Sequence, residues 1–172
     1  ALPIYQRSGV SPRFAIAGAE TIAAAALHRA TVQGEDDAVA RVVDLQTAVD
    51  VLGGKIEFES GEEGREADIL THLLRTAIAE TVRTHFRGLD FALLVEAIEN
   101  GQMVTTGEQV TARDFLAGLP RLGESDLYDQ VCDRLGATGD GASAAAIELA
   151  LEGLYLARKI GKDSDGSQTV YG

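Results

Sequence analysis

The residues best suited to chemistry by type and spacing lie at the start of the chain, in the block R-S-G-V-S-P-R-F at positions 7–14. Ser11 followed by Pro12 predicts the start of a helix, because serine caps free N–H groups and proline suits the first helical position. Arg13 then falls in the first turn, where the helix dipole disfavours a cation. Free backbone N–H groups beside a planar guanidinium can hold an anion such as phosphate. The same residues also allow a simpler interpretation, a surface arginine at a capped helix.

The histidines and the single cysteine show no spacing that indicates catalysis or metal binding. His28, His72 and His85 fall on different turns or helices and lack the spacing of a metal-ligand pair. Cys132 is the only cysteine, which excludes a disulfide within the chain and a cysteine-based zinc site. It lies on an apolar helix face, so we expect a small core residue rather than a nucleophile.

Two acidic segments have the composition of cation sites without the required spacing. Asp163-x-Asp165 resembles the start of a calcium loop but lacks the glycine and the glutamate that follow in such loops. The other segment is predicted to be a solvated acidic loop, and its carboxylates are those of Glu57, Glu59, Glu62, Glu63 and Glu66. The sequence contains no G-x-x-x-x-G-K-[ST], G-x-S-x-G or H-E-x-x-H motif.

The elements that would position these groups are predicted to be helices. An alanine-rich helix starts near Ser11, and Gly34 is a fitting C-cap. The stretch 36–52 has helical spacing and begins with two aspartates that offer an N-cap, while Asp44 could divide it in two. The clearest stripe of period 3.6 covers residues 69–86.

Beyond a soft domain boundary near Gly88 the predicted elements are shorter. They are a helix over 89–100, a loop or small hairpin over 102–110, a helix over 112–119 capped by Thr111, a helix over 125–135 capped by Ser125 and closed by Gly136, a connector over 137–142 and a last helix ending near Ile160. The tail 163–172 is polar, and we expect it to be flexible. The predicted fold class is all-α, in one or more helical bundles, with at most a short extended segment such as 55–59 or a hairpin.

Composition and charge exclude several classes of protein. The chain has 172 residues, 15 Lys+Arg against 27 Asp+Glu, a formal net charge of −12 and 45% hydrophobic residues. The apolar fraction excludes general disorder. The negative charge argues against sequence-independent nucleic-acid binding and against docking on an anionic membrane. No apolar run approaches the roughly 18 residues that span a bilayer, and no secretion signal is evident, so we expect a cytoplasmic location.

Four blocks of the sequence resemble one family. The block S-G-V-S-P-R-F-A-I-A-G-A-E-T at 8–21 looks like the start of the lid in AAA+ ATPases of the magnesium-chelatase and MoxR-like group. In that group a G-x-S-x-R-type helix start carries the arginine called sensor 2. The blocks 34–45, 54–66 and 146–160, with the terminal T-V-Y-G, are similar to the C-terminal part of one bacterial branch. Members of that branch are labelled magnesium chelatase-like or sigma-54-interacting regulators.

The resemblance implies that the chain is the C-terminal part of an ATPase, with an AAA+ lid-like bundle over 1–88 and a helical extension over 89–172. Family members carry Walker A, Walker B, sensor 1 and an arginine finger in an α/β core, and this sequence has none of them. Arg13 matches sensor 2 and is expected to touch the γ-phosphate of ATP held by that core, with Arg7 as a further candidate near the nucleotide. We therefore expect no catalytic residue and no metal site in this chain, and ATP and Mg²⁺ bound by the parent protein only.

The resemblance also implies a homo-oligomeric ring in the parent protein and a partner with a von Willebrand factor A-type domain. Two other interpretations stay open. A free-standing all-α module could use its acidic surface to bind a basic partner. An all-α enzyme would need two carboxylates that converge in a cleft with perturbed pKa values.

Overall fold

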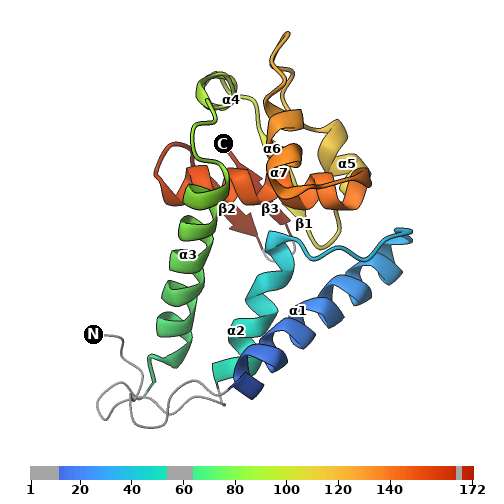
Figure 1. Ribbon diagram of the computed structural model, residues 1–172, viewed down its shortest axis with the longest axis vertical. Helices are drawn as coiled ribbons and strands as arrows, with labels where there is room; N and C mark the ends of the chain where they lie inside the picture. The colour runs from blue at the N-terminus through green and yellow to red at the C-terminus, as the bar shows by residue number, and fades with distance from the viewer. Residues whose placement is uncertain (1–11, 54–63, 166–167) are drawn as a thin grey trace.

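A computed structural model describes residues 12–53, 64–165 and 168–172 (Figure 1). Within these ranges the chain forms seven α-helices, one 3₁₀ helix and a small three-stranded antiparallel sheet. The fold is therefore mainly α, as predicted, although the sheet goes beyond the hairpin that the sequence led us to expect. The extended segment predicted over 55–59 lies outside the described residues.

The N-terminal half is built around three helices. Helix α1 (Pro12–Gln33) packs against α2 (Gln46–Leu52), and α2 packs against α3 (Glu66–His85) (Figure 1). Helix α1 begins at proline and is followed by Gly34 at φ 68°, the position predicted for its C-cap. Its predicted N-cap, Ser11, lies outside the described residues. A small apolar cluster joins the three helices; its buried members are Ala48, Val49, Leu52 and Leu70.

The stretch 36–52 differs from its prediction. The two aspartates at its start do not cap a helix, because helical structure begins only with the 3₁₀ helix η1 (Val42–Leu45). The stretch is divided as anticipated, but after Leu45 rather than at Asp44. Asp44 does not cap α2, because the residue at that N-cap is Leu45, without a side-chain bond. Asp44 is instead buried, and its carboxylate serves a charge network described below.

The C-terminal half holds four shorter or more buried helices. They are α4 (Ala92–Glu99), α5 (Ala112–Ala117), α6 (Leu127–Leu135) and α7 (Gly139–Leu156). Thr111 caps α5 as predicted, since its Oγ1 accepts a 3.0 Å hydrogen bond from the Asp114 N–H. Gly136 closes α6 at φ 62°. Ser125 is not the N-cap of α6, because that position is held by the next residue.

The connector predicted over 137–142 is mostly helical. Helix α7 starts at Gly139 and includes the alanines that follow. The high helix propensity of these alanines outweighs the low helix propensity of Gly139 and Gly141. The helix also ends at Leu156, earlier than predicted, and Arg158 has φ 59°. A left-handed residue just past a helix end is a common way to stop it.

The tail predicted to be flexible is part of the sheet. Strands β2 (Lys162–Asp165) and β3 (Gln168–Tyr171) pair antiparallel, and β3 also pairs with β1 (Val104–Gly107). The strand order is β1-β3-β2, so the last strand of the chain is the central one. Tyr171 is 1% exposed and lies opposite Val104, which anchors the C-terminal segment in the interior.

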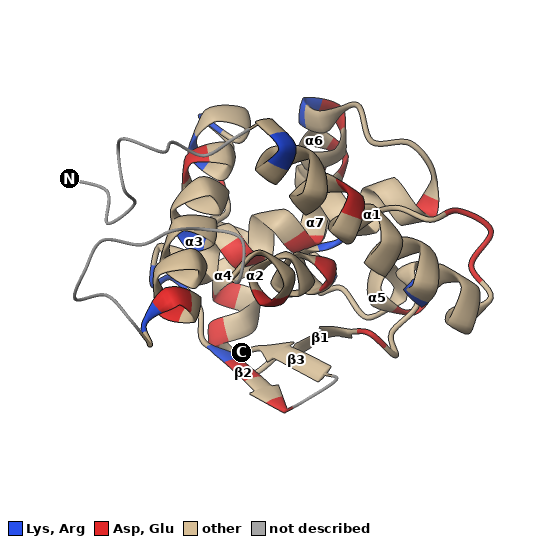
Figure 2. Cartoon of the chain, turned by 90° about the horizontal axis from the view of Figure 1, so that it is seen from below, with Lys and Arg blue, Asp and Glu red and all other residues tan. Residues whose placement is uncertain are grey.

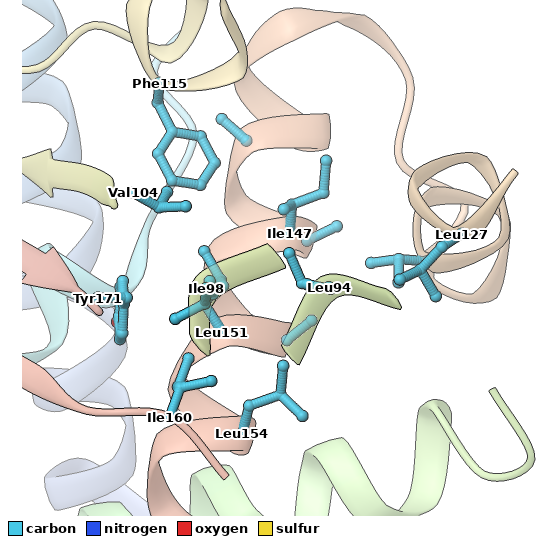
Figure 3. Packing of buried hydrophobic residues seen from close by; sticks show 14 of the residues in the cluster. Leu94, Ile98, Val104, Phe115, Leu127, Ile147, Leu151, Leu154, Ile160 and Tyr171 are labelled. Atoms are coloured by element: carbon cyan, nitrogen blue, oxygen red, sulfur yellow. The ribbon is translucent and has the colours of Figure 1, made fainter. Parts of the chain in front are cut away.

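Helix α7 is the centre of the main core. It packs against α3, α5 and α6, and its apolar residues face more than one neighbour, as predicted (Figure 3). The buried side chains of this core include Leu94, Val104, Phe115, Leu127, Ile147, Leu151 and Tyr171. Phe86 at the end of α3 also belongs to it, so the core extends across the boundary expected near Gly88. None of the helices in the described ranges is long and apolar enough to cross a membrane.

Gly153 gives a test of the contact between α3 and α7. A Cβ at Gly153 would lie 2.5 Å from Cγ1 and 2.8 Å from Cγ2 of Val82, closer than real carbon atoms approach. We expect Gly153→Ala to lower the free energy of unfolding by about 1–3 kcal/mol, through overpacking. Urea denaturation measures this loss. In a Val82→Ala background, which removes both Cγ atoms, the loss should be at most about half as large; an equal loss in both backgrounds would contradict this packing.

Candidate functional site

Arg13 lies where the sequence predicted it, in the first turn of α1. Its side chain is exposed, and no described residue forms a hydrogen bond or ion pair with it. The first turn of α1 contains no acidic residue. Arg7 lies outside the described residues. Among the described residues, Arg13 is therefore a cation without a partner at the positive end of the dipole of this 22-residue helix.

The other groups considered from the sequence do not converge. His28 lies on α1, and His72 and His85 lie on α3, all three exposed. Cys132 is half-buried against the main core, the position predicted for it. Within the described ranges, no group of three or more histidine, cysteine or acidic side chains is arranged to hold a metal ion.

The two acidic segments are only partly described. Glu66 stands at the start of α3, and a hydrogen bond from its own backbone N–H lowers the pKa of its carboxyl. The other carboxylates of the cluster, at 57–63, lie outside the described residues. Asp163 and Asp165 are exposed on β2, in a strand rather than in a calcium loop.

The structure instead brings together a buried charge network that sequence reasoning missed. Its first half is Arg29 of α1, which is 4% exposed. The guanidinium donates two hydrogen bonds of 3.1 Å to the Asp44 carboxylate and one of 2.7 Å to Glu35 Oε2. A further bond of 2.7 Å goes to the Val39 carbonyl. Burial alone would lower the pKa of Arg29, but hydrogen bonding and charge from Asp44, with charge from Glu35, raise it overall.

The second half is Arg41, whose side chain is 1% exposed. Its Nε donates to Glu148 Oε2 at 2.8 Å, and its two terminal nitrogens donate to the Val110 carbonyl and to Thr106 Oγ1 at 2.7 Å. Thr106 in turn donates to Glu148 Oε1 at 3.0 Å. The guanidinium carbon lies 5.3 Å from the centre of the Phe115 ring, within cation–π range.

Backbone groups join the two halves and extend them. The Arg41 N–H donates to Asp44 Oδ2 at 2.8 Å, so one carboxylate serves both arginines. The Ala112 N–H donates to Glu35 Oε1 at 2.6 Å, which ties the start of α5 to the segment after α1. We call this set the buried arginine network; its members are Arg29, Glu35, Arg41, Asp44, Thr106 and Glu148. It connects α1, η1, α5, α7 and β1.

A second buried cluster fixes the end of the chain to α7. Glu152 Oε2 accepts a 2.7 Å hydrogen bond from the Tyr171 hydroxyl and another of 2.7 Å from Lys162 Nζ. The Lys162 ammonium also lies 5.4 Å and 5.6 Å from the ring centres of Tyr155 and Tyr171. Burial, together with the charge of Glu152, raises the pKa of the Tyr171 hydroxyl. Burial also raises the pKa of Tyr128 to about 12.

The hydrogen bonds and ion pairs of these two clusters connect separate elements of the fold. They also occupy the buried carboxylates that acid–base catalysis would need. Each carboxylate in them accepts hydrogen bonds from an arginine, a lysine or a backbone N–H group. No buried polar side-chain atom in the described part of the chain lacks a hydrogen-bond partner. The arrangement therefore offers no support for the interpretation as a carboxylate enzyme.

One sequence signal could have revealed these clusters. Glu148 and Glu152 are four residues apart on α7 and are flanked by Ile147 and Leu151. A charge that repeats inside an apolar helix stripe indicates a buried partner, because an unpaired buried carboxylate is very costly. The residues that pair with these glutamates have no such local signal. Arg41, for example, is more than 100 residues away from Glu148 in the sequence.

The comparisons with known proteins do not assign a family. No family model, no curated protein and no solved structure gives a significant match to this chain.

Arg41→Leu tests the energetic role of the buried arginine network. The substitution leaves Glu148 buried without its cation, so we expect the free energy of unfolding to fall by about 3–5 kcal/mol. Urea denaturation followed by circular dichroism measures this. Adding Glu148→Leu should recover a large part of the loss. The control is Arg113→Leu, which breaks an exposed 3.7 Å pair with Asp140 and should cost at most about 1 kcal/mol. Equal losses for the two arginines would contradict the network.

Tyr171→Phe tests the C-terminal cluster through pH. The pKa of Tyr171 is higher in the folded chain than its ordinary value of 10.0. The protonated Tyr171 hydroxyl therefore makes its full contribution to the free energy of unfolding below about pH 10. This contribution is lost as the pH rises further. We expect Tyr171→Phe to cost about 1.5–3 kcal/mol at neutral pH, the value of a hydrogen bond to a charged group. Between pH 8 and 11, urea denaturation should show the two proteins converging; a constant difference would contradict the assignment.

Proposed function

We propose that this chain is the helical lid and C-terminal helical extension of a magnesium chelatase-like AAA+ ATPase. The observation that carries the proposal is Arg13, which is exposed in the first turn of α1 and has no partner among the residues that the structure describes. It lies within the block 8–21 that resembles the sensor 2 helix start of that family. In this role Arg13 contacts the γ-phosphate of ATP bound to an α/β core that the chain does not contain.

Elementary electrostatics supports this role. A cation in the first turn of a helix opposes the dipole at a cost of about 0.3–1 kcal/mol, and nothing in the described structure offsets it. A phosphate group would offset it, because both the free backbone N–H groups and the guanidinium then face an anion. An arginine that stabilises charge on a transferring phosphoryl group is a recurrent device in ATPases.

The buried arginine network supplies a mechanical reason for the role. Arg29 and Arg41 fasten α1 and the segment after it to α5, α7 and β1. A contact at the start of α1 would therefore act on a unit that includes the C-terminal half. In the proposed machine, ATP binding and hydrolysis move this unit as a lid, and the chain itself holds no catalytic residue.

The remaining parts of the proposal concern the parent protein. The core binds ATP and Mg²⁺, the ATPase assembles as a homo-oligomeric ring, and a protein with a von Willebrand factor A-type domain is its partner. The location is the cytoplasm. The location follows from the expectation stated in the sequence analysis, and the other parts follow from the family resemblance.

A free-standing acidic interaction module is the second candidate. The observation in its favour is the net charge of −12, with carboxylates on many elements and on the loop that follows α1, at the right of Figure 2. Such a module has no use for an exposed arginine at the start of α1 that has no partner in the described ranges. Arg13 therefore distinguishes the two candidates.

The decisive experiment begins with the gene upstream of the codon for Ala1. The proposal expects an in-frame strand followed by G-x-x-x-x-G-K-[ST] and a Walker B motif. In the protein that carries this core, Arg13→Ala should lower kcat for ATP hydrolysis by about tenfold or more. The control is Arg75→Ala, another exposed arginine, on α3, which should leave kcat within about twofold.

Two results would overturn the proposal. One is a start codon directly before Ala1 with no ATPase core encoded upstream, which would favour the interaction module. The other is an ATPase whose turnover is the same with and without Arg13. The isolated chain, in either case, should not hydrolyse ATP in a coupled phosphate-release assay.

A further inference from the structure

Two hollows lie on either side of one segment of backbone. Residues 37–39 rest directly on the start of α7, because a Cβ placed on Gly141 would lie 3.0 Å from Val39 Cγ2 and 3.9 Å from Asp37 Cβ. One hollow has a volume of about 490 Å³ and the other of about 360 Å³. Asp37 and Gly141 line the first, and Val39 and Ala142 line the second.

The smaller hollow is an apolar groove between η1, the end of α6 and α7. The large side chains along it are half-buried, so the groove keeps apolar surface in contact with water. These side chains belong to Val39, Val42, Leu45, Leu135 and Leu149, and Ala145 lies among them. Covering such surface is favourable at about 25 cal/mol per Å², which makes the groove a place for an apolar side chain.

The larger hollow is acidic. Its ionisable lining residues are Glu35, Asp36, Asp37, Asp114, Asp140 and one cation, Arg113. Arg113 is 3.7 Å from Asp140, and Glu35 already serves the buried arginine network. The exposed carboxylates of Asp36 and Asp37 belong to the loop that follows α1 (Figure 2). Acidic residues alone would mark only a solvated surface; here they adjoin the apolar groove.

The two hollows share a rim. Asp37 and Val39 are two residues apart, and Gly141 and Ala142 are adjacent, so acidic and apolar surface meet within about 7 Å of extended backbone. We propose that this surface binds a segment of another protein that carries a large apolar side chain and, within about four residues of it, lysine or arginine. The apolar side chain enters the groove, and the basic residue lies over the acidic hollow.

Charge argues for this occupant over others. A second copy of the chain would bring its own net charge of −12 to an acidic surface. Nucleic acid and anionic lipid would be repelled for the same reason. The described carboxylates do not form a group that could hold a metal ion. The proposal is independent of the ATPase role, since neither hollow includes Arg13.

The test uses the full chain and fluorescein-labelled peptides in anisotropy titrations at low and high salt. The probe is a short amphipathic peptide of leucine and lysine. One matched peptide replaces lysine with glutamate, and another replaces leucine with serine. We expect both replacements to weaken binding by about tenfold or more, and high salt to weaken the probe's binding. Equal binding of the serine peptide would overturn the role of the groove.

Variants of the chain localise the binding. The double variant Asp37→Lys/Asp140→Lys should weaken the probe by about fivefold or more, since both residues are exposed on the acidic hollow. The control Glu96→Lys/Glu124→Lys makes the same charge change outside both hollows, and its affinity should stay within about twofold. Equal weakening by the two doubles would show that only net charge matters and would overturn the proposal.

A last variant separates the groove from its alternatives. Ala145→Phe fills the apolar groove from α7, and it should weaken the probe while leaving the far-ultraviolet circular dichroism unchanged. If this variant perturbs folding, amide shifts from nuclear magnetic resonance on the unaltered chain replace it; shifts on 36–42 and 135–149 support the site, and shifts elsewhere overturn it. A dimer of the chain alone that Ala145→Phe dissociates would assign the groove to a second copy and refute the proposal.

Discussion

The rest of the structure depends on the hydrogen bonds that the buried carboxylate of Asp44 accepts. It accepts hydrogen bonds from the Arg29 side chain and from the Arg41 backbone, and Arg41 then reaches Glu148 in the middle of α7. Each of these charges is at least 95% buried, so each is tolerable only because the others are present. The network therefore fixes α1, η1 and α7 in one arrangement.

Much of the fold can be predicted where the signal is local. The helix start at Pro12, the Thr111 cap and the Gly136 stop depend on chemistry within one turn of the residue. The places where prediction failed depend on distant partners. Strand β3 forms because it pairs with β1 and β2 on its two sides. In addition, the Tyr171 hydroxyl donates a hydrogen bond to Glu152, and the Lys162 ammonium lies over the Tyr171 ring. The sequence of a short polar tail does not reveal these contacts.

The candidate sites likewise include one feature that the sequence predicts and others that only the fold reveals. Arg13 could be predicted because serine, proline and arginine in succession identify a helix start and its exposed first turn. The apolar groove could not, since its lining comes from η1, α6 and α7, which lie close together only in the folded chain. The acidic hollow likewise combines the segment after α1 with the starts of α5 and α7. Sequence shows the charges, and only the fold shows that they share a rim with apolar side chains.

The burial of charge also explains why recognition must take place at the surface. The interior holds two arginines and three carboxylates nearly free of solvent: Arg29, Arg41, Asp44, Glu148 and Glu152. Among the described residues these buried charges sum to −1, so they account for little of the net charge of −12. The interior ion pairs hold the helices and strands in place. A binding partner would contact an acidic surface. Arg13, which is exposed and has no partner within the described part of the chain, favours an anion locally, whereas the acidic hollow beside α7 favours a cation.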